Sequence, residues 1–280
     1  MSEERTFVPE TEIEIIRDAP RGAFKHVLFD FDGTISLLRE GWQDIMAPVC
    51  VEMICGDTEP TTEILDAVEA MIDETTGIQT IFQMERLVEM VKQYGLVPAA
   101  KVLDAPAYKQ IYNDRLMVPV NERLAKLKSG ALDREDVTVN GVHDFLERMK
   151  ARGLAMYVFS GTDRDDVRNE CEKVGAAPFF QEIWGALPSV EEYSKEKVIR
   201  EIMAEHRLQG PEVLAIGDGP VELRNVKDAG GVAIGVCSDE QRGQGWDLQK
   251  RDRLIKAGAD YLVADFGEAE QLVAYLFNEA

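Results

Sequence analysis

The chain lacks long apolar runs and carries little positive charge. No apolar stretch approaches the roughly 20 residues that a membrane-spanning helix needs, and the segment Met1–Pro20 is acidic and polar, without the apolar centre of a signal peptide. Its 31 Lys and Arg are outnumbered by 52 Asp and Glu, so the formal net charge is -21. Such a charge repels nucleic acids and anionic membrane surfaces. We therefore expect a cytoplasmic protein with neither of these partners, present as a monomer or a homodimer.

Cysteine is also scarce. The four cysteines (Cys50, Cys55, Cys171 and Cys237) show no C-x-x-C spacing and no paired histidines, which the usual zinc sites require. All four lie in apolar segments, where a thiol behaves as a small hydrophobic residue. The sequence therefore argues against a zinc site and predicts reduced cysteines in the core.

Apolar residues make up 45% of the chain and follow two different periodicities. Residues 42–54, 62–75, 79–94 and 108–128 show helical spacing with no convincing strand between them. From residue 137 onward strands alternate with helices. The expected strands are 155–159, 180–184, 213–216, 232–236 and 261–263, and the expected helices are 142–152, 163–174, 195–206, 221–229, 248–257 and 268–277.

One further strand, His26–Phe29, lies far upstream of the others. Alternating strands and helices predict an α/β fold, with a parallel sheet covered on both faces, so the helical block must be an insertion. The expected organisation is an N-terminal extension at 1–24 with an edge strand within 11–16, a discontinuous core at 25–36 and 139–280, and an all-helical insertion at 37–138.

Two aspartates, Asp30 and Asp32, follow the first strand directly. Residues i and i+2 of a strand share a face, so both carboxylates point to one place. Two anions at one buried point are unfavourable unless a cation lies between them or one of them is protonated. Taken alone, the segment is also compatible with a turn that caps a helix.

Other polar residues follow two more strands, and the carboxyl ends of parallel strands meet at one edge of the sheet. Ser160-Gly161-Thr162 offers a hydroxyl and backbone amides that suit a phosphate, although a helix cap explains the hydroxyl equally well. Gly217-Asp218-Gly219-Pro220-Val221-Glu222 places two acids four residues apart. Capping of the following helix accounts for one of these acids and not for both.

Four converging carboxylates need compensation. Carboxylates about 5 Å apart repel by roughly 3 kcal/mol per pair at an effective dielectric constant near 20. A divalent cation and a lysine are therefore expected, with Lys195 as the first candidate and Lys197 as its rival. Oxygen-only ligands with room for water and a phosphate oxygen suit Mg²⁺ better than zinc.

These motifs together resemble the haloacid dehalogenase superfamily, in particular its phosphoglycolate-phosphatase-like branch with a helical cap. The resemblance covers residues 25–280 and rests on Asp30-Phe31-Asp32-Gly33-Thr34, Ser160-Gly161-Thr162, Lys195, and Gly217-Asp218 with Glu222. It implies a Rossmann-like three-layer core with a helical cap inserted after the first motif. It also implies a Mg²⁺-dependent phosphatase that acts on a small phosphorylated metabolite.

The resemblance implies a role for each motif residue. Asp30 would be the nucleophile that forms an aspartyl-phosphate, and Asp32 the acid that protonates the leaving oxygen and then activates water. Gly33, Thr34, Ser160, Gly161 and Lys195 would bind the phosphoryl group. Asp30, the backbone carbonyl of Asp32, Asp218 and Glu222 would hold Mg²⁺, Glu222 either directly or in a second layer.

The sequence departs from the family pattern in two places, and alternatives remain open. Glu222 stands where the fourth motif usually has Asp. The insertion is longer than many caps of this type, so the identity of the substrate cannot be inferred from that of a relative. A phosphomutase on the same scaffold is one alternative, although Thr34 follows the hydrolase pattern; a non-catalytic binding protein is the other. Arg39 and Trp42 follow the first motif closely enough to reach the crevice. The alternative is that Arg39 is an ordinary surface residue and Trp42 an ordinary core residue.

Overall fold

The computed structural model describes residues 5–187 and 194–279. The chain forms two compact units. One comprises the chain up to Glu40 and from Lys126 onward, and the other comprises Gly41–Ala125. We call them the core unit and the helical unit and describe each by itself.

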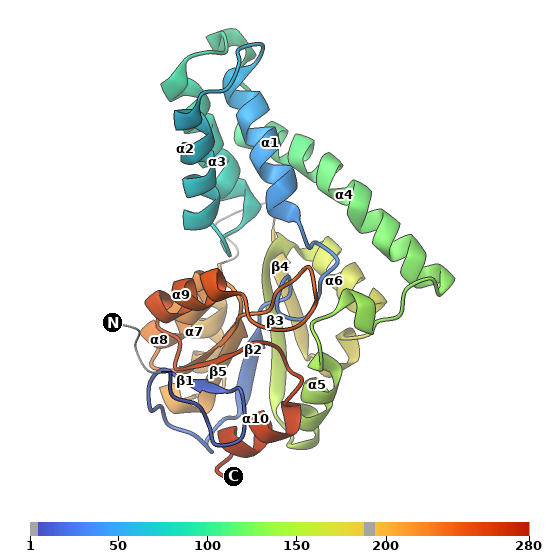
Figure 1. Cartoon of the computed structure of the whole chain (residues 1–280). Coiled ribbons are helices and arrows are strands. Elements are labelled where there is room, and N and C mark those ends of the chain that lie inside the picture. Colours follow the sequence, from blue (N-terminus) through green and yellow to red (C-terminus); the bar gives the residue numbers. More distant parts are fainter. Residues whose placement is uncertain (1–4, 188–193, 280) are drawn as a thin grey trace. The chain divides into compact units, whose positions relative to one another are not determined.

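The core unit is built on a mostly parallel sheet. Its described residues form seven strands in the order β1-β7-β6-β5-β2-β3-β4 (Figure 1). Every neighbouring pair is parallel except β1 and β7. This confirms the expected α/β class. The strands are β1 (Glu14–Ile15), β2 (His26–Phe29), β3 (Ala155–Asp163), β4 (Glu182–Ala186), β5 (Val213–Gly217), β6 (Val232–Val236) and β7 (Tyr261–Val263).

Helices cover both faces of this sheet, as the alternation predicted (Figure 1). On one side lie α7 (Lys195–Glu205), α8 (Pro220–Asp228) and α9 (Leu248–Ala257). Their apolar residues Ile199, Leu223 and Leu254 join Leu28 and Phe159 of the sheet in one buried cluster. On the other side lie α5 (Val142–Ala151), α6 (Arg164–Lys173) and α10 (Ala269–Leu276). The central strand β2 is therefore buried on both faces.

The helical unit contains the predicted helices. They are α1 (Trp42–Cys55), α2 (Thr62–Glu74), α3 (Thr80–Tyr94) and α4 (Ala105–Ser129), the last of which continues beyond Ala125. The unit has its own apolar cluster, which includes Met46, Leu87 and Tyr108. Trp42 packs against this cluster, so its core interpretation is the one that the structure favours. Among the described residues no helix combines the length and the apolar character needed to cross a membrane.

The segments that connect the two units belong to the core unit. The amide of Leu37 donates to the carbonyl of Val137 at 2.8 Å, and the amide of Val139 donates to the carbonyl of Ile35 at 3.1 Å. These bonds tie the outgoing and returning segments together. As a result, the helical unit is shorter at both ends than the 37–138 segment expected from the sequence.

The N-terminal segment is part of the core unit. β1 falls within the edge strand expected at 11–16 and pairs with β7. Ile13 is buried, and the buried Glu14 accepts two hydrogen bonds from Arg251 of α9, at 2.6 and 2.8 Å. The described part of the expected extension therefore completes an edge of the sheet.

We predict that Phe145→Ala destabilises the protein strongly. The ring of Phe145 in α5 is fully buried, and it stacks on Phe266 with centroids 4.7 Å apart beneath the strand that carries Asp30. Truncating a buried phenylalanine costs about 3–5 kcal/mol. Urea unfolding measures the loss, with Leu248→Ala on the exposed face of α9 as the control. A loss for Phe145→Ala no larger than the control's would contradict this packing.

Candidate active site

The first motif forms a tight loop at the carboxyl end of β2. The amide of Asp30 still pairs with Ile216 of β5 at 2.9 Å, and the amide of Phe31 donates back to Asp30 Oδ1 at 2.8 Å. Asp30 is buried. The side chain of Asp32 keeps 25% of its surface exposed. Of the two aspartates, Asp32 is therefore the one that solvent reaches.

Gly33 allows this loop to close. Its φ of 71° is in the left-handed region, and a Cβ there would lie 2.3 Å from Asp218 Oδ2. Any side chain would therefore strain the backbone and push Asp218 away. The amide of Gly33 donates to the carbonyl of Ser36 at 2.9 Å, and the hydroxyl of the fully buried Thr34 donates to Asp218 Oδ1 at 3.4 Å. Both donors are engaged within the protein rather than free for the phosphate contacts expected of them.

Of the two candidate lysines, Lys195 is the one that contacts the candidate carboxylates. It is the first residue of α7, and its buried Nζ donates to Asp30 Oδ2 at 2.7 Å and to Glu222 Oε2 at 2.9 Å. The rival Lys197 is exposed and lies 4.0 Å from Glu201 on the same helix. Burial raises the pKa of Asp30 well above its usual range. The positive charge of Lys195 opposes this rise, whereas Glu222 and Asp218 add to it.

Three of the predicted carboxylates form a group that fits a metal ion. Asp30, Asp218 and Glu222 each offer one oxygen, and these oxygens lie within 4.8 Å of one another. Glu222 is fully buried, and its Oε1 accepts a hydrogen bond from the amide of Gly219, the N-cap of α8, at 2.6 Å. Carboxylate oxygens at this spacing match the donor preference of Mg²⁺. Glu222 thus serves as a helix cap and as a member of the acid group.

Asp32 lies among the residues of the second motif. Its Oδ2 accepts a hydrogen bond from Thr162 Oγ1 at 2.7 Å and a longer one from Ser160 Oγ at 3.5 Å. The helix expected at 163–174 begins at Arg164, directly after this motif, and the strand is longer than expected because β3 continues through Asp163, which pairs with Ala186 of β4. The segment is extended, and both hydroxyls bind Asp32. Gly161 lies between them, half-buried.

The sequence left two interpretations of Arg39 open, and the structure favours the one in which it reaches the site. It is buried and not at the surface, and its guanidinium binds Glu170 of α6, with Nη2 at 2.6 Å from Oε1. Its Nε lies 3.9 Å from Asp32 Oδ1, a buried oxygen without a hydrogen-bond partner. Burial raises the pKa of Asp32, while Arg39 and the hydroxyl of Thr162 lower it. Burial also raises the pKa of Glu170, to about 7.

A second missed pair lies beyond the end of β6. Lys250 of α9 is buried, and its Nζ lies 2.5 Å from Glu240 Oε1 and 3.0 Å from Asp218 Oδ2. The rule that located Asp218, that polar residues following a strand converge, applies equally to Glu240 after residues 232–236. Nothing local in the sequence marks Lys250, because it lies in the middle of a basic helical segment.

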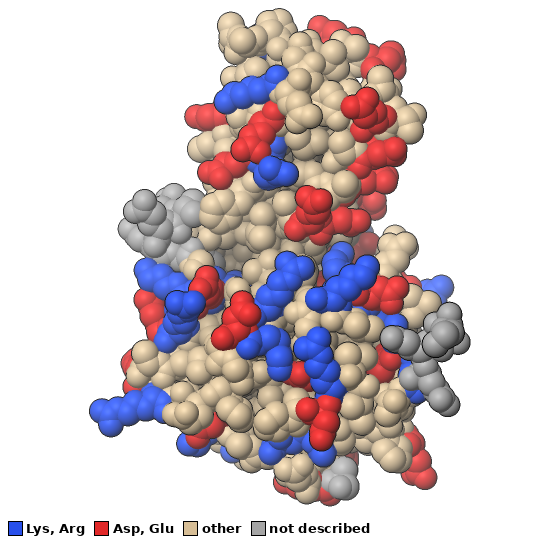
Figure 2. Space-filling model, turned by 90° about the vertical axis from the view of Figure 1, so that its left-hand side faces the viewer, with Lys and Arg blue, Asp and Glu red and all other residues tan. Residues whose placement is uncertain are grey.

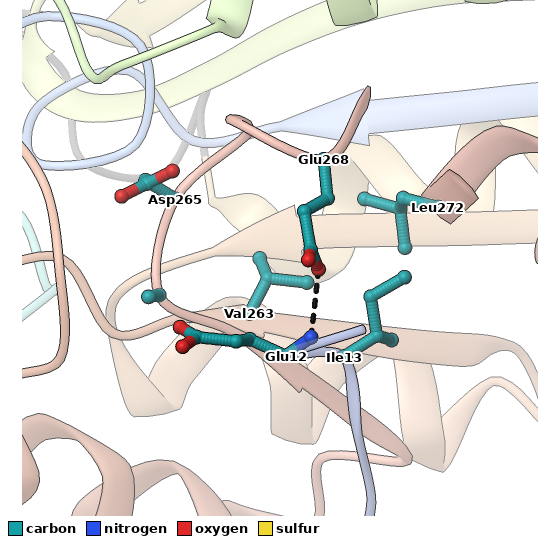
Figure 3. Close-up of a pocket in the computed structure, with 7 residues that line it drawn as sticks. Glu12, Ile13, Val263, Asp265, Glu268 and Leu272 are labelled. Atoms are coloured by element: carbon teal, nitrogen blue, oxygen red, sulfur yellow. Dashed lines mark hydrogen bonds between the residues drawn. The ribbon is translucent and has the colours of Figure 1, made fainter. Parts of the chain in front are cut away.

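A separate cavity of about 220 Å³ lies elsewhere in the core unit, beside β7 and the N-terminal segment (Figure 3). Two of its acidic side chains, Asp265 and Glu268, accept hydrogen bonds from backbone amides, and that of Glu12 accepts one from Trp246. Glu268 accepts a hydrogen bond from the amide of Glu12 at 2.8 Å, and Asp265 accepts from the amides of Gly245 and Gly267 at 2.8 and 2.7 Å. This cavity therefore lacks the opposed acids and cation found at the ends of β2 and β5.

Positive charge is concentrated locally in spite of the acidic composition. Figure 2 shows Lys and Arg side chains gathered, among some acidic ones, on the face of the core unit formed by α7–α9, whereas acidic side chains dominate the visible face of the helical unit. The helices of this face also carry the two buried lysines, Lys195 and Lys250. The net charge of -21 is thus unevenly distributed.

The fold and the acid group define an α/β protein whose buried carboxylates gather at the carboxyl ends of parallel strands. The sequence profile of the haloacid dehalogenase-like hydrolases matches residues 27–236. The chain belongs to this family.

Individual relatives are distant. A phosphoglycolate phosphatase from Synechococcus elongatus is 22% identical over 139 residues, which are 50% of this chain and 60% of that protein. The chain thus spans about 60% of the length of this curated relative. The profile match confirms the family resemblance, and this phosphoglycolate phosphatase is similar to the chain over half of the chain's length.

Solved structures share the fold. A predicted phosphatase from Clostridium acetobutylicum has a TM-score of 0.60 at 18% identity, covering 90% of this chain and 99% of its own. A beta-phosphoglucomutase from Clostridium difficile has a TM-score of 0.61 at 12% identity, covering 91% and 98%. At such identities the likeness is one of fold, and it includes both hydrolases and a mutase.

We predict that Lys195→Met destabilises the protein and that Lys197→Met does not. Removing Lys195 leaves Asp30 and Glu222 buried without their cation, which costs about 3–5 kcal/mol. The exposed Lys197 contributes within about 0.5 kcal/mol. Urea unfolding in the absence of divalent ions measures both variants.

The loss should depend on pH. An unpaired Asp30 has a folded-state pKa raised above its unfolded value, so its ionisation costs stability as the pH rises through the folded-state pKa. The deficit of Lys195→Met is therefore expected to be smaller near pH 5 than near pH 8. Equal stabilities of the two lysine variants, or a deficit that grows on acidification, would contradict the bridging role of Lys195.

Proposed function

We propose that the protein is a Mg²⁺-dependent phosphomonoester hydrolase that acts on a small phosphorylated metabolite through an aspartyl-phosphate. One observation carries the proposal. A buried aspartate, Asp30, is held by a buried lysine, and a second aspartate two residues later remains accessible and bound to hydroxyls. This arrangement supports Asp30 as the nucleophile and Asp32 as the acid and base.

In this proposal Asp30 attacks phosphorus with one carboxylate oxygen while the bond from phosphorus to the ester oxygen breaks. The amide of Phe31 and the ammonium of Lys195 fix the two oxygens of Asp30, which limits its freedom before attack. Lys195 also favours the ionised carboxylate against the effect of burial. Its charge would then offset that of the incoming phosphoryl group.

Asp32 supplies and recovers one proton. As an acid it protonates the leaving alkoxide, and the resulting carboxylate then takes a proton from the water that attacks the aspartyl-phosphate. The raised pKa of Asp32 supports the first step, because the protonated form must be populated. Thr162 and Arg39 orient the carboxyl group of Asp32 through different oxygens. The hydroxyl of Thr162 contacts Oδ2, whereas Arg39 approaches Oδ1.

The phosphoryl group would be held chiefly by Ser160, the amide of Gly161 and Lys195. Gly33 and Thr34, first expected among these ligands, are better explained as shaping residues, because their donors bind Ser36 and Asp218. Asp30, Asp218 and the backbone carbonyl of Asp32 would hold Mg²⁺, with Glu222 behind them as the partner of Lys195. When bound, the ion would neutralise charge on the phosphate and on the acids.

The chemistry of the substrate is proposed only as a class. The relative from Synechococcus is named a phosphoglycolate phosphatase, which supports a small phosphorylated metabolite of that kind. A cytoplasmic location is part of the proposal and is supported by four free, buried cysteines.

We predict that Asp30→Asn lowers phosphate release at least about a thousandfold, because an amide is not a nucleophile for phosphorus. The measurement is inorganic phosphate released from a panel of phosphorylated metabolites in the presence of Mg²⁺. Asp18→Asn, an exposed aspartate of the same unit, is the matched control. Equal rates for Asp30→Asn and wild type would contradict the proposal, and isomerised sugar phosphate without free phosphate would indicate a mutase.

Asp32→Asn should affect the two half-reactions differently. With para-nitrophenyl phosphate the leaving phenolate needs no proton, so the first step survives while hydrolysis of the aspartyl-phosphate slows. We expect a burst of nitrophenolate close to one equivalent of enzyme, followed by slow turnover, and a phosphorylated Asp30 peptide in mass spectra. Slow turnover without any burst would contradict the double role of Asp32.

A further inference from the structure

Lys250 is a second buried lysine, besides Lys195, that binds a proposed metal ligand directly, and it lies outside the four sequence motifs. Its Nζ lies 3.0 Å from Asp218 Oδ2, and only 7% of its side-chain surface is exposed. The other oxygen of Asp218 accepts the longer hydrogen bond from Thr34. A lysine and a divalent ion are therefore directed at the same carboxylate.

Lys250 has a second carboxylate partner besides Asp218. Glu240 Oε1 lies 2.5 Å from Nζ, and the side chain of Glu240 is 15% exposed. Glu240 also reaches the first motif, since its Oε1 lies 3.1 Å from the Cβ position of Gly33. The ammonium thus sits between one acid that belongs to the metal group and one that does not.

We propose that Lys250 is a built-in cation that competes with Mg²⁺ for Asp218, and that Glu240 retains Lys250 when the ion binds. This inference rests on the metal site of the proposed function. In the metal-free protein Lys250 neutralises Asp218 and stabilises the buried acid group. When the ion binds Asp218, repulsion between the two cations weakens the contact with Lys250, and Glu240 prevents the ammonium from being left buried without a partner.

This arrangement sets the affinity for the ion. The positive charge of Lys250 weakens Mg²⁺ binding, and the negative charge of Glu240 partly cancels that effect. Removing the two charges should therefore change the affinity in opposite directions. A pair that served only to support the fold would give losses of the same sign.

The experiment is a calorimetric titration of metal-free protein with Mg²⁺, without substrate. We expect Lys250→Met to lower the dissociation constant by about tenfold, and Glu240→Gln to raise it by about tenfold. Thermal unfolding gives a second readout: the rise in Tm on adding Mg²⁺ should be larger than wild type in Lys250→Met and smaller in Glu240→Gln. Lys256→Met makes the same replacement at an exposed position of α9 and should match wild type.

Weaker binding in both variants, or no change in either, would overturn the competition. Glu240→Gln exchanges groups of nearly equal shape, so this variant tests the competition even if Lys250→Met does not fold. Unchanged or tighter Mg²⁺ binding by Glu240→Gln would then contradict the competition between Lys250 and the ion. Since the titration needs no turnover, it tests the role of Lys250 independently of the phosphatase proposal, which Asp30→Asn tests through phosphate release.

Discussion

The site depends on one electrostatic constraint, which is that carboxylates from distant parts of the chain must share a buried point. β2 delivers Asp30, and the start of α8 delivers Glu222, 192 residues later in the sequence numbering. Their repulsion in a poorly hydrated place would push the strand end and the helix apart. Lys195 prevents this by donating to both, at 2.7 and 2.9 Å. The same contact that holds the fold together here also places Asp30 and favours its ionised form against the effect of burial.

The position of Lys195 in its own helix supports a functional reading. It is the first residue of α7, after the N-cap Ser194. A positive charge at that end opposes the helix macrodipole, which favours acids there. A surface lysine would gain nothing from this position. Two buried carboxylates compensate for this unfavourable placement. Tertiary contacts therefore override the local preference of a helix N-terminus for acids, as is expected where function constrains a residue.

The sequence predicted what local patterns determine and missed what distant partners determine. β2, β6, β7 and α9 have the bounds expected from their apolar runs and flanking turn residues. β3 is longer than expected because Asp163 pairs with Ala186 of β4, a contact that no local pattern records. Arg39 followed a surface pattern, yet its partner Glu170 lies 131 residues away. The aspartates were recognisable because each follows a predicted strand. The role of Lys250 can be recognised only once α9 is packed against β6.

The three buried Lys and Arg side chains among the described residues share a common arrangement, and it bears on the charge balance of the site. Each contacts a carboxylate with a proposed chemical role and also a second carboxylate. The sets are Lys195 with Asp30 and Glu222, Arg39 with Asp32 and Glu170, and Lys250 with Asp218 and Glu240. Six acids with three cations leave three negative charges in excess before substrate binds. A divalent ion and one proton would neutralise them, and burial raises the pKa of Asp32, the residue from which the proposed chemistry requires a proton. Burial also raises the pKa of Asp30, Glu170 and Glu240, so the charge balance calls for one proton among these acids, and the proposed reaction draws that proton from Asp32.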